Sequence, residues 1–239
     1  TRDFRPSIYD LLAGRYLEFL KDGSFFNSEF EAAKTEVSKE VLFATDSRFV
    51  NTEITDVENS KLLALRQYQE LERIHSKDKG DVSLNYWKLQ RIEFVHAEFH
   101  DDFQEYISAI EKLEENSKDR KIKAQLMFEL ANAYAEKASE RDEEGLPKYP
   151  QYNAKAVNLL KLIESNFNNT LTRQNAQNLL KILTTPSLEA QLQNILTQNE
   201  PGRARLTYKN MDTVYMKIGK VGMNFLNNVN YRDRADIIK

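Results

Sequence analysis

The feature that most constrains this chain is a change of hydrophobic period at Pro186. Before Pro186, apolar residues recur every three or four positions, the spacing that places them on one face of a helix. After it, apolar and polar residues alternate, as they do in strands with one buried face. The pattern predicts a mainly α chain, with a helical-repeat domain over residues 1–186 and an incomplete β domain over residues 187–239.

The helical part divides into amphipathic segments separated by turn-forming residues. The first follows Pro6, and its expected buried stripe is Ile8, Leu11, Leu12, Tyr16, Phe19 and Leu20. Six further stripes are Leu62–Ile74, Tyr86–Phe99, Phe103–Leu113, Ile122–Ala138, Ala156–Ile163 and Ala176–Leu183. The stripe from Phe103 is expected to open at Asp101, because Asp is a favourable N-cap residue. Residues 24–57 give a weaker pattern, which predicts a short helix near Glu29–Ser38 and buried rings at Phe25, Phe26, Phe43 and Phe49.

The spacing inside one pair of helices is that of a tetratricopeptide repeat. Met127, Leu130, Ala131 and Tyr134 fit its first helix, and Ala156, Leu160 and Ile163 fit its second. Small residues at these positions let the two helices approach closely, while large ones fill the groove between hairpins. About a dozen extra residues lie in the intervening turn. An unrelated helical bundle is the alternative interpretation of the same pattern.

Beyond Pro186 the alternation predicts short strands. One is centred on Leu188, Ala190 and Leu192, a second on Ala204, Leu206 and Tyr208, and a third on Val214, Met216 and Ile218. Two or three strands are too few for a stable β domain. The chain also begins at Thr1 and not at Met, so we expect it to be a piece of a longer protein.

Composition excludes several function classes. The chain has no Cys, which excludes disulfides, Cys-ligated zinc and a thiol nucleophile within it. A net charge of −3 argues against nucleic acid as the main partner. No apolar run approaches the ~20 residues needed to span a bilayer. We predict no catalytic residue, no cofactor and no enzymatic activity.

Two histidines are weak candidates for a metal site. His96 and His100 are four residues apart, so they share a helix face and could bind zinc together. The metalloprotease motif has Glu directly after its first His, whereas this chain has Ala97 there. The alternative is that both are ordinary residues of a helix end. We therefore assign no metal ligand.

Two further features could contact a partner. The aromatic residues Tyr86, Trp87, Tyr106 and Tyr134 could line a groove for a peptide, although aromatics at helical spacing are more often core residues. The insertion Arg141–Pro150 is polar and contains two prolines, which is typical of an exposed loop. It is either a functional loop or a tolerated variation in length.

Both ends of the chain resemble one protein family. The segment from Pro201 to Ile218, with Tyr208-Lys209-Asn210 and Val214-Tyr215-Met216-Lys217-Ile218, resembles the first macroglobulin domain of large bacterial alpha-2-macroglobulin family proteins. The segment from Arg5 to Arg15 resembles a stretch of the same family's N-terminal helical region, with Gly14 where that family has His. The two segments occur in the family's order, and helical repeats lie between them.

The resemblance implies an exported, multidomain and non-enzymatic protein of the periplasm or cell surface. Its macroglobulin domains would form a cage that traps proteases, and this chain would be a scaffold or docking region. The partners would then be proteases, through the full-length parent, and other domains of the same chain. The alternative is a free-standing helical-repeat module that binds peptide, glycan or protein partners in the bacterial envelope.

Overall fold

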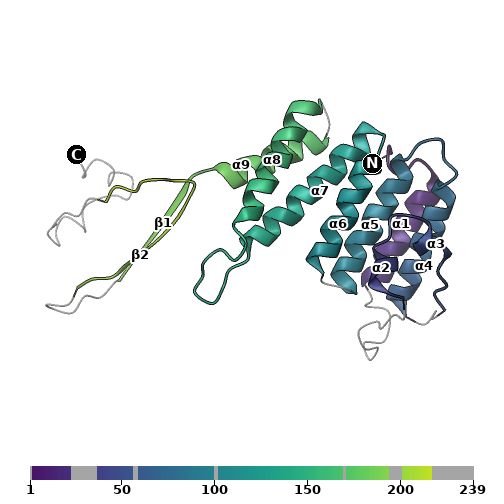
Figure 1. The fold of residues 1–239 in the computed structure, drawn as a ribbon, viewed down its shortest axis with the longest axis horizontal. Helices are drawn as coiled ribbons and strands as arrows, with labels where there is room; N and C mark the ends of the chain where they lie inside the picture. The colour runs from purple at the N-terminus through teal and green to yellow at the C-terminus, as the bar shows by residue number, and fades with distance from the viewer. Residues whose placement is uncertain are drawn as a thin grey trace, which may run out of the picture. The chain divides into compact units, whose positions relative to one another are not determined.

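The computed structural model describes residues 2–22, 37–55, 59–99, 102–168, 171–193 and 201–216. These ranges contain nine helices and one two-stranded antiparallel sheet (Figure 1). The chain forms two compact units, Thr1–Leu183 and Thr184–Lys239. The division falls close to Pro186, where the hydrophobic period changes.

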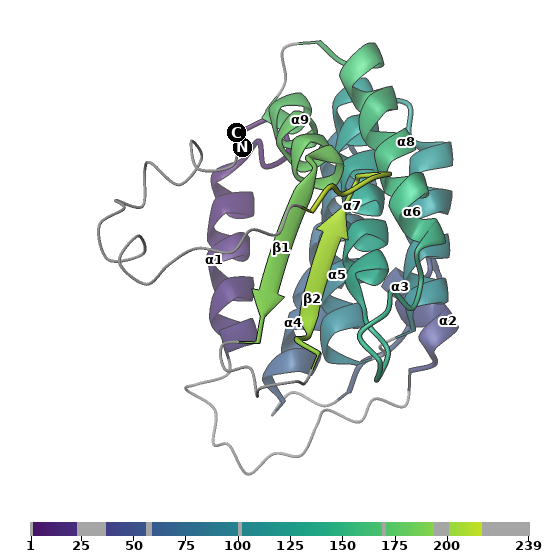
Figure 2. The ribbon, with the colours of Figure 1, turned by 90° about the vertical axis from the view of Figure 1, so that its left-hand side faces the viewer.

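The helices occupy the first unit. They are α1 (Ile8–Asp22), α2 (Lys39–Leu42), α3 (Arg48–Asn51), α4 (Ser60–His75), α5 (Val82–Glu98), α6 (Phe103–Asn116), α7 (Arg120–Ser139), α8 (Gln151–Asn166) and α9 (Leu171–Thr184), the last of which ends one residue into the second unit. Along the chain, α1 packs on α4, and α4 to α8 then pack each on the next (Figures 1 and 2). α5 also contacts α7, so alternate helices meet.

Side-chain caps set where several helices begin. The side chains of Asn59, Asp102 and Asp119 accept hydrogen bonds from backbone N–H groups in the first turns of α4, α6 and α7. Such caps satisfy N–H groups that have no partner within the helix. The cap of α6 is Asp102 and not the predicted Asp101, which lies outside the described residues, because the Asp102 carboxylate reaches the N–H of Glu105 at 3.1 Å.

The predicted buried stripe of α1 is wrong. Ile8, Leu11, Leu12, Tyr16 and Phe19 are exposed, and only Leu20 of that stripe is buried. The face packed against the other helices carries Asp10, Ala13, Gly14, Leu17 and Leu20. Small residues permit the close approach: a Cβ on Gly14 would lie 3.7 Å from the Trp87 ring and 3.0 Å from the Arg5 guanidinium. Hydrophobic periodicity indicates the more apolar side of α1. The side that packs against the other helices is instead the one with smaller residues.

Three side chains attach residues 42–52 to α4 and α5 through backbone carbonyls. Arg91 donates to the carbonyls of Leu42 and Ala44, and Lys88 donates to that of Thr45. Gln69 donates to the carbonyls of Phe49 and Thr52. Phe43 and Phe49 are buried, as predicted, but Phe25, Phe26 and most of the expected helix at Glu29–Ser38 lie outside the described residues.

The second unit contains β1 (Ser187–Leu192) and β2 (Ala204–Lys209), which pair antiparallel. The register places Leu188 opposite Tyr208, Ala190 opposite Leu206 and Leu192 opposite Ala204, so the apolar side chains share one face. The first two predicted strands are therefore present. The third is not seen in residues 213–216, which are described without strand structure, and Ile218 lies outside the described residues.

Candidate functional site

Polar side chains from alternate helices meet on one face of the first unit. On α5, Glu93 accepts a hydrogen bond from Gln90 at 2.7 Å. On α7, Glu129 accepts from Gln125 at 2.7 Å and from Asn132 at 3.3 Å. Gln125 in turn accepts from Thr172 of α9 at 3.1 Å. We call this set, together with Lys21 of α1, the inner polar face.

The carboxyl groups of the inner polar face are partly buried, and this changes their acidity. Burial raises the pKa of Glu93 to about 8, and the negative charge of Glu129 adds to the effect while Lys21 opposes it. Burial also raises the pKa of Glu129, despite the two amide hydrogen bonds that it accepts. Burial lowers the pKa of Lys21, although Glu93 and Glu98 favour its charged form.

The inner polar face is better suited to binding a partner molecule than to binding a metal ion. Arrays of helical hairpins commonly bind extended partners on the face formed by alternate helices. Carboxyl groups on α5 and α7, with amide groups beside them, would exchange hydrogen bonds with polar groups of a partner. No group of three or more His, Cys, Asp or Glu side chains that could hold a metal ion occurs among the described residues.

Of the two histidines predicted as weak metal candidates, the structure describes only His96. His96 lies on α5 and stacks on the ring of Tyr106, with 4.3 Å between ring centroids and 9° between ring planes. His100 lies outside the described residues. The ring stack gives His96 a packing role next to the inner polar face.

The four predicted groove aromatics belong to the core. Tyr86, Trp87, Tyr106 and Tyr134 are all buried. Their rings pack against other aromatics: Tyr86 meets Trp87 edge to face at 5.0 Å, and Tyr134 stacks on Tyr152 at 5.3 Å. No ring of the four presents an open face to a peptide. The inner polar face, which the aromatic pattern did not indicate, is the better candidate surface.

A second polar cluster lies where α1 meets α4 and α5. The buried carboxylate of Asp10 contacts the His75 ring nitrogen Nε2 at 2.6 Å and accepts from Trp87 Nε1 at 3.3 Å. Its other oxygen accepts from the backbone N–H and the hydroxyl of Ser7, at 2.9 and 2.7 Å. The Nδ1 atom of His75 contacts Asp78 at 2.7 Å.

Ser, His and Asp are the residue types of a hydrolase triad, but their arrangement here is different. A nucleophilic Ser must hydrogen-bond to the His that takes its proton. The Ser7 hydroxyl is bonded to Asp10 and also accepts from the Asp10 backbone N–H at 3.1 Å, which makes a capping box at the start of α1. The cluster therefore acts as a clamp that holds α1 on α4 and α5. The sequence signal Ser7-x-x-Asp10 indicates the capping box, but not the contacts of Asp10 with His75 and Trp87.

We expect Asp10→Asn to lower the free energy of unfolding by about 2 kcal/mol, because buried donors lose a charged acceptor. Burial raises the pKa of Asp10, but hydrogen bonds from Ser7 and His75 outweigh it, and the net shift is downward. The carboxylate thus stabilises the fold above its unfolded pKa of about 3.8, and that contribution is lost as the pH falls. Urea unfolding at pH 7 and pH 3.5 would measure both effects. Glu18→Gln, on the exposed side of α1, is the control, and an equal loss in both variants would contradict the prediction.

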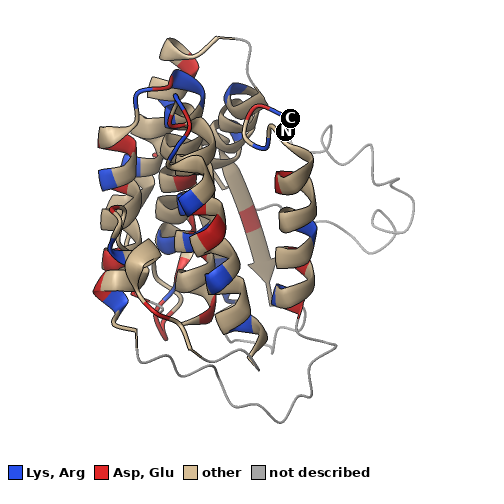
Figure 3. Ribbon diagram, turned by 90° about the vertical axis from the view of Figure 1, so that its right-hand side faces the viewer, with Lys and Arg blue, Asp and Glu red and all other residues tan. Residues whose placement is uncertain are grey.

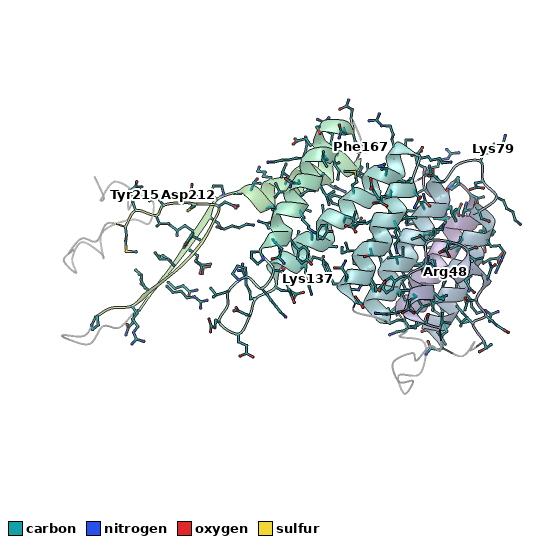
Figure 4. All side chains as sticks on the ribbon, viewed as in Figure 1. Arg48, Lys79, Lys137, Phe167, Asp212 and Tyr215 are labelled. Carbon is teal, nitrogen blue, oxygen red and sulfur yellow. The ribbon has the colours of Figure 1, made fainter. Side chains whose placement is uncertain are left out.

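The insertion Arg141–Pro150 is an ordered turn at the exposed end of α7 (Figure 4, where Lys137 marks its base). The Asp142 carboxylate accepts from the N–H groups of Glu144 and Leu146, and Gly145 adopts a positive φ of 81°. Lys137 and Lys148 lie over the Tyr149 ring, at 4.9 and 5.2 Å from its centroid. The polar groups of the insertion bond mainly to one another. This agrees both with a functional loop and with a tolerated variation in length.

An open pocket of about 750 Å³ lies at the ends of α4, α5 and α6. Three of the charged side chains that line it have partners within the protein. Asp78 contacts His75, Lys88 donates to the Thr45 carbonyl, and Asp81 accepts from the N–H groups of Lys118 and Asp119. This pocket is therefore a weaker candidate than the inner polar face.

Comparison of this chain with protein-family models, with curated proteins and with solved structures found no match. Among the described residues, no helix has a stretch long and apolar enough to cross a membrane.

Proposed function

We propose that this chain is a non-catalytic scaffold and docking region of an exported bacterial alpha-2-macroglobulin-like protease inhibitor. In this proposal the first unit is an array of tetratricopeptide-like hairpins, and the second is the start of a macroglobulin-like β domain. The observation that supports it best is the order of parts. A helical unit is followed by an antiparallel strand pair with one apolar face, and the two segments that resemble the family lie in these units in the family's order.

In this proposal the helical unit binds other domains or a protease and catalyses no reaction. Its inner polar face offers acceptor groups from α5 and α7, and amide groups of the same helix orient each of the two carboxyl groups: Gln90 for Glu93, and Gln125 and Asn132 for Glu129. Trapping of a protease would belong to domains beyond Lys239. The periplasm or cell surface is the location that this proposal requires.

The experiment uses the full-length parent protein mixed with an endoprotease. Caging blocks access of large substrates to the protease but leaves its active site free, so we expect cleavage of a large protein substrate to collapse while a small chromogenic peptide is still hydrolysed. Parent protein that has been heat-denatured before mixing is the control. Unchanged rates on both substrates, across several proteases, would contradict the inhibitor proposal.

A second candidate is a stand-alone helical-repeat module that binds a peptide, glycan or protein in the bacterial envelope. The partly buried carboxyl groups of Glu93 and Glu129 favour this candidate, because they offer a recognition surface that does not need the second unit. A parent protein that leaves protease activity unchanged would favour it over the first.

A further inference from the structure

The side of α1 that faces away from the other helices is an apolar surface. Ile8 and Leu12 are 77% and 62% exposed, and Tyr9, Leu11 and Tyr16 are also exposed. These five residues are called the outer face of α1. Four of them lie on the side away from Asp10, Ala13 and Leu17, the residues by which α1 packs on the unit, and Tyr9 lies at the edge, where its hydroxyl accepts from Gln67 of α4 at 3.2 Å. In Figure 3 the helix below the N label is α1, and most of it is drawn in tan, the colour of residues other than Lys, Arg, Asp and Glu.

An exposed apolar surface of this kind is unusual at the end of a helical array. Terminal helices of such arrays normally have a polar outer side, because it keeps the protein soluble. Phe19, near the end of α1, is exposed as well. On the other described elements of the first unit, large exposed apolar residues are scattered: Ile74 on α4, Leu146 in the loop, Leu162 on α8, and Leu171 and Ile182 on α9. The outer face of α1 concentrates five within three helical turns, a pattern that marks an interaction surface.

Area and charge both favour a second copy of this chain as the occupant. The five side chains expose on the order of 600 Å², so two copies facing each other would bury at most about 1,200 Å², the lower end of the range for stable specific interfaces. Arg15 lies on the outer face, between Leu11 and Ile8 around the helix, and pairs with Glu18 at 3.8 Å. The two charges cancel, so the face carries no net charge that would repel a second copy. A two-fold axis would bring the same residues of both copies together.

We propose that two copies of this chain associate through the outer face of α1, with the two α1 helices antiparallel across a two-fold axis. Antiparallel packing also places the positive end of each helix dipole beside the negative end of the other. Sedimentation velocity of the full chain, from about 1 to about 200 µM, would detect the dimer. We expect the sedimentation coefficient to rise from the monomer to the dimer value over this range.

Variants test whether the outer face of α1 is responsible. We expect Leu12→Glu to weaken dimerisation at least tenfold and to keep the wild-type circular dichroism spectrum, since Leu12 is already exposed and Glu is a good helix former. Leu11→Lys is a second variant with the same expected result. Leu162→Glu on α8 and Leu192→Glu on β1 are matched controls and should still dimerise.

Two results would overturn the proposal. The first is a wild-type chain that remains monomeric at every concentration. The second is a dimer that persists in folded Leu12→Glu and Leu11→Lys chains, particularly if Leu192→Glu abolishes it, because the exposed apolar face of the strand pair would then be the contact.

Discussion

Arg91→Met is expected to lower the free energy of unfolding by about 3–5 kcal/mol, because it leaves a buried carboxylate without its counter-charge. Arg91 is fully buried and donates to the Glu72 carboxylate at 2.6 Å. It also donates to two carbonyls of residues 42–44 and lies 4.2 Å from the Phe49 ring centroid. One substitution thus removes an ion pair, two hydrogen bonds to backbone and a cation–π contact.

Guanidinium unfolding followed by circular dichroism would measure the loss. Arg66→Met, on the exposed side of α4, is the matched control and should change stability by less than about 0.5 kcal/mol. The double variant Glu72→Gln/Arg91→Met should recover part of the loss, since burial already raises the pKa of Glu72 and a neutral side chain removes the uncompensated charge. Equal destabilisation by Arg91→Met and Arg66→Met would show that the buried pair is not needed.

Glu93→Gln is expected to remove a pH dependence of stability between about pH 4.5 and pH 8. The pKa of Glu93 is about 8 in the folded protein and about 4.5 when exposed, so folding takes up a proton between these values. Stability must therefore fall as the pH rises through this window. Gln resembles the protonated form, and we expect the variant to be more stable than wild type by about 1–3 kcal/mol at pH 8.5 and nearly equal to it at pH 4.5.

Thermal or urea unfolding at several pH values would follow this difference. Glu115→Gln, on the exposed side of α6, is the control for removing one negative charge without changing a buried site. A Glu93→Gln effect that is the same at pH 4.5 and pH 8.5 would contradict the assignment of a protonated Glu93. The experiment also tests the inner polar face, because the raised pKa depends on burial beside Glu129.

Sequence reasoning located the helices and strands better than the faces they use. Stripes such as Leu62, Leu65 and Leu71 on α4 are buried as predicted, because that helix has neighbours on its apolar side. On α1 the most apolar side is the open one. Periodicity measures which side of a helix is apolar, whereas packing also depends on side-chain size, and Ala13 and Gly14 permit an approach that Leu12 and Tyr16 would prevent.

The polar clusters could not be predicted because their members meet only in three dimensions. Asp10 and His75 are 65 positions apart, and nothing in the sequence near either residue indicates the other. Glu93 and Glu129 occur among many acidic residues, and their altered pKa values arise from burial by other helices. The aromatic residues chosen from spacing were core residues for the same reason: spacing on one helix does not show what covers it.

The attachment of residues 42–52 has a consequence for how related sequences can diverge. This segment is held mainly through its backbone carbonyls, which every amino acid possesses, and through the buried side chains of Leu42, Phe43 and Phe49. The residues that specify its position are Gln69, Lys88 and Arg91, in helices that follow later in the chain. Relatives can therefore differ at most positions of the segment and keep its path, provided that those three donors are retained.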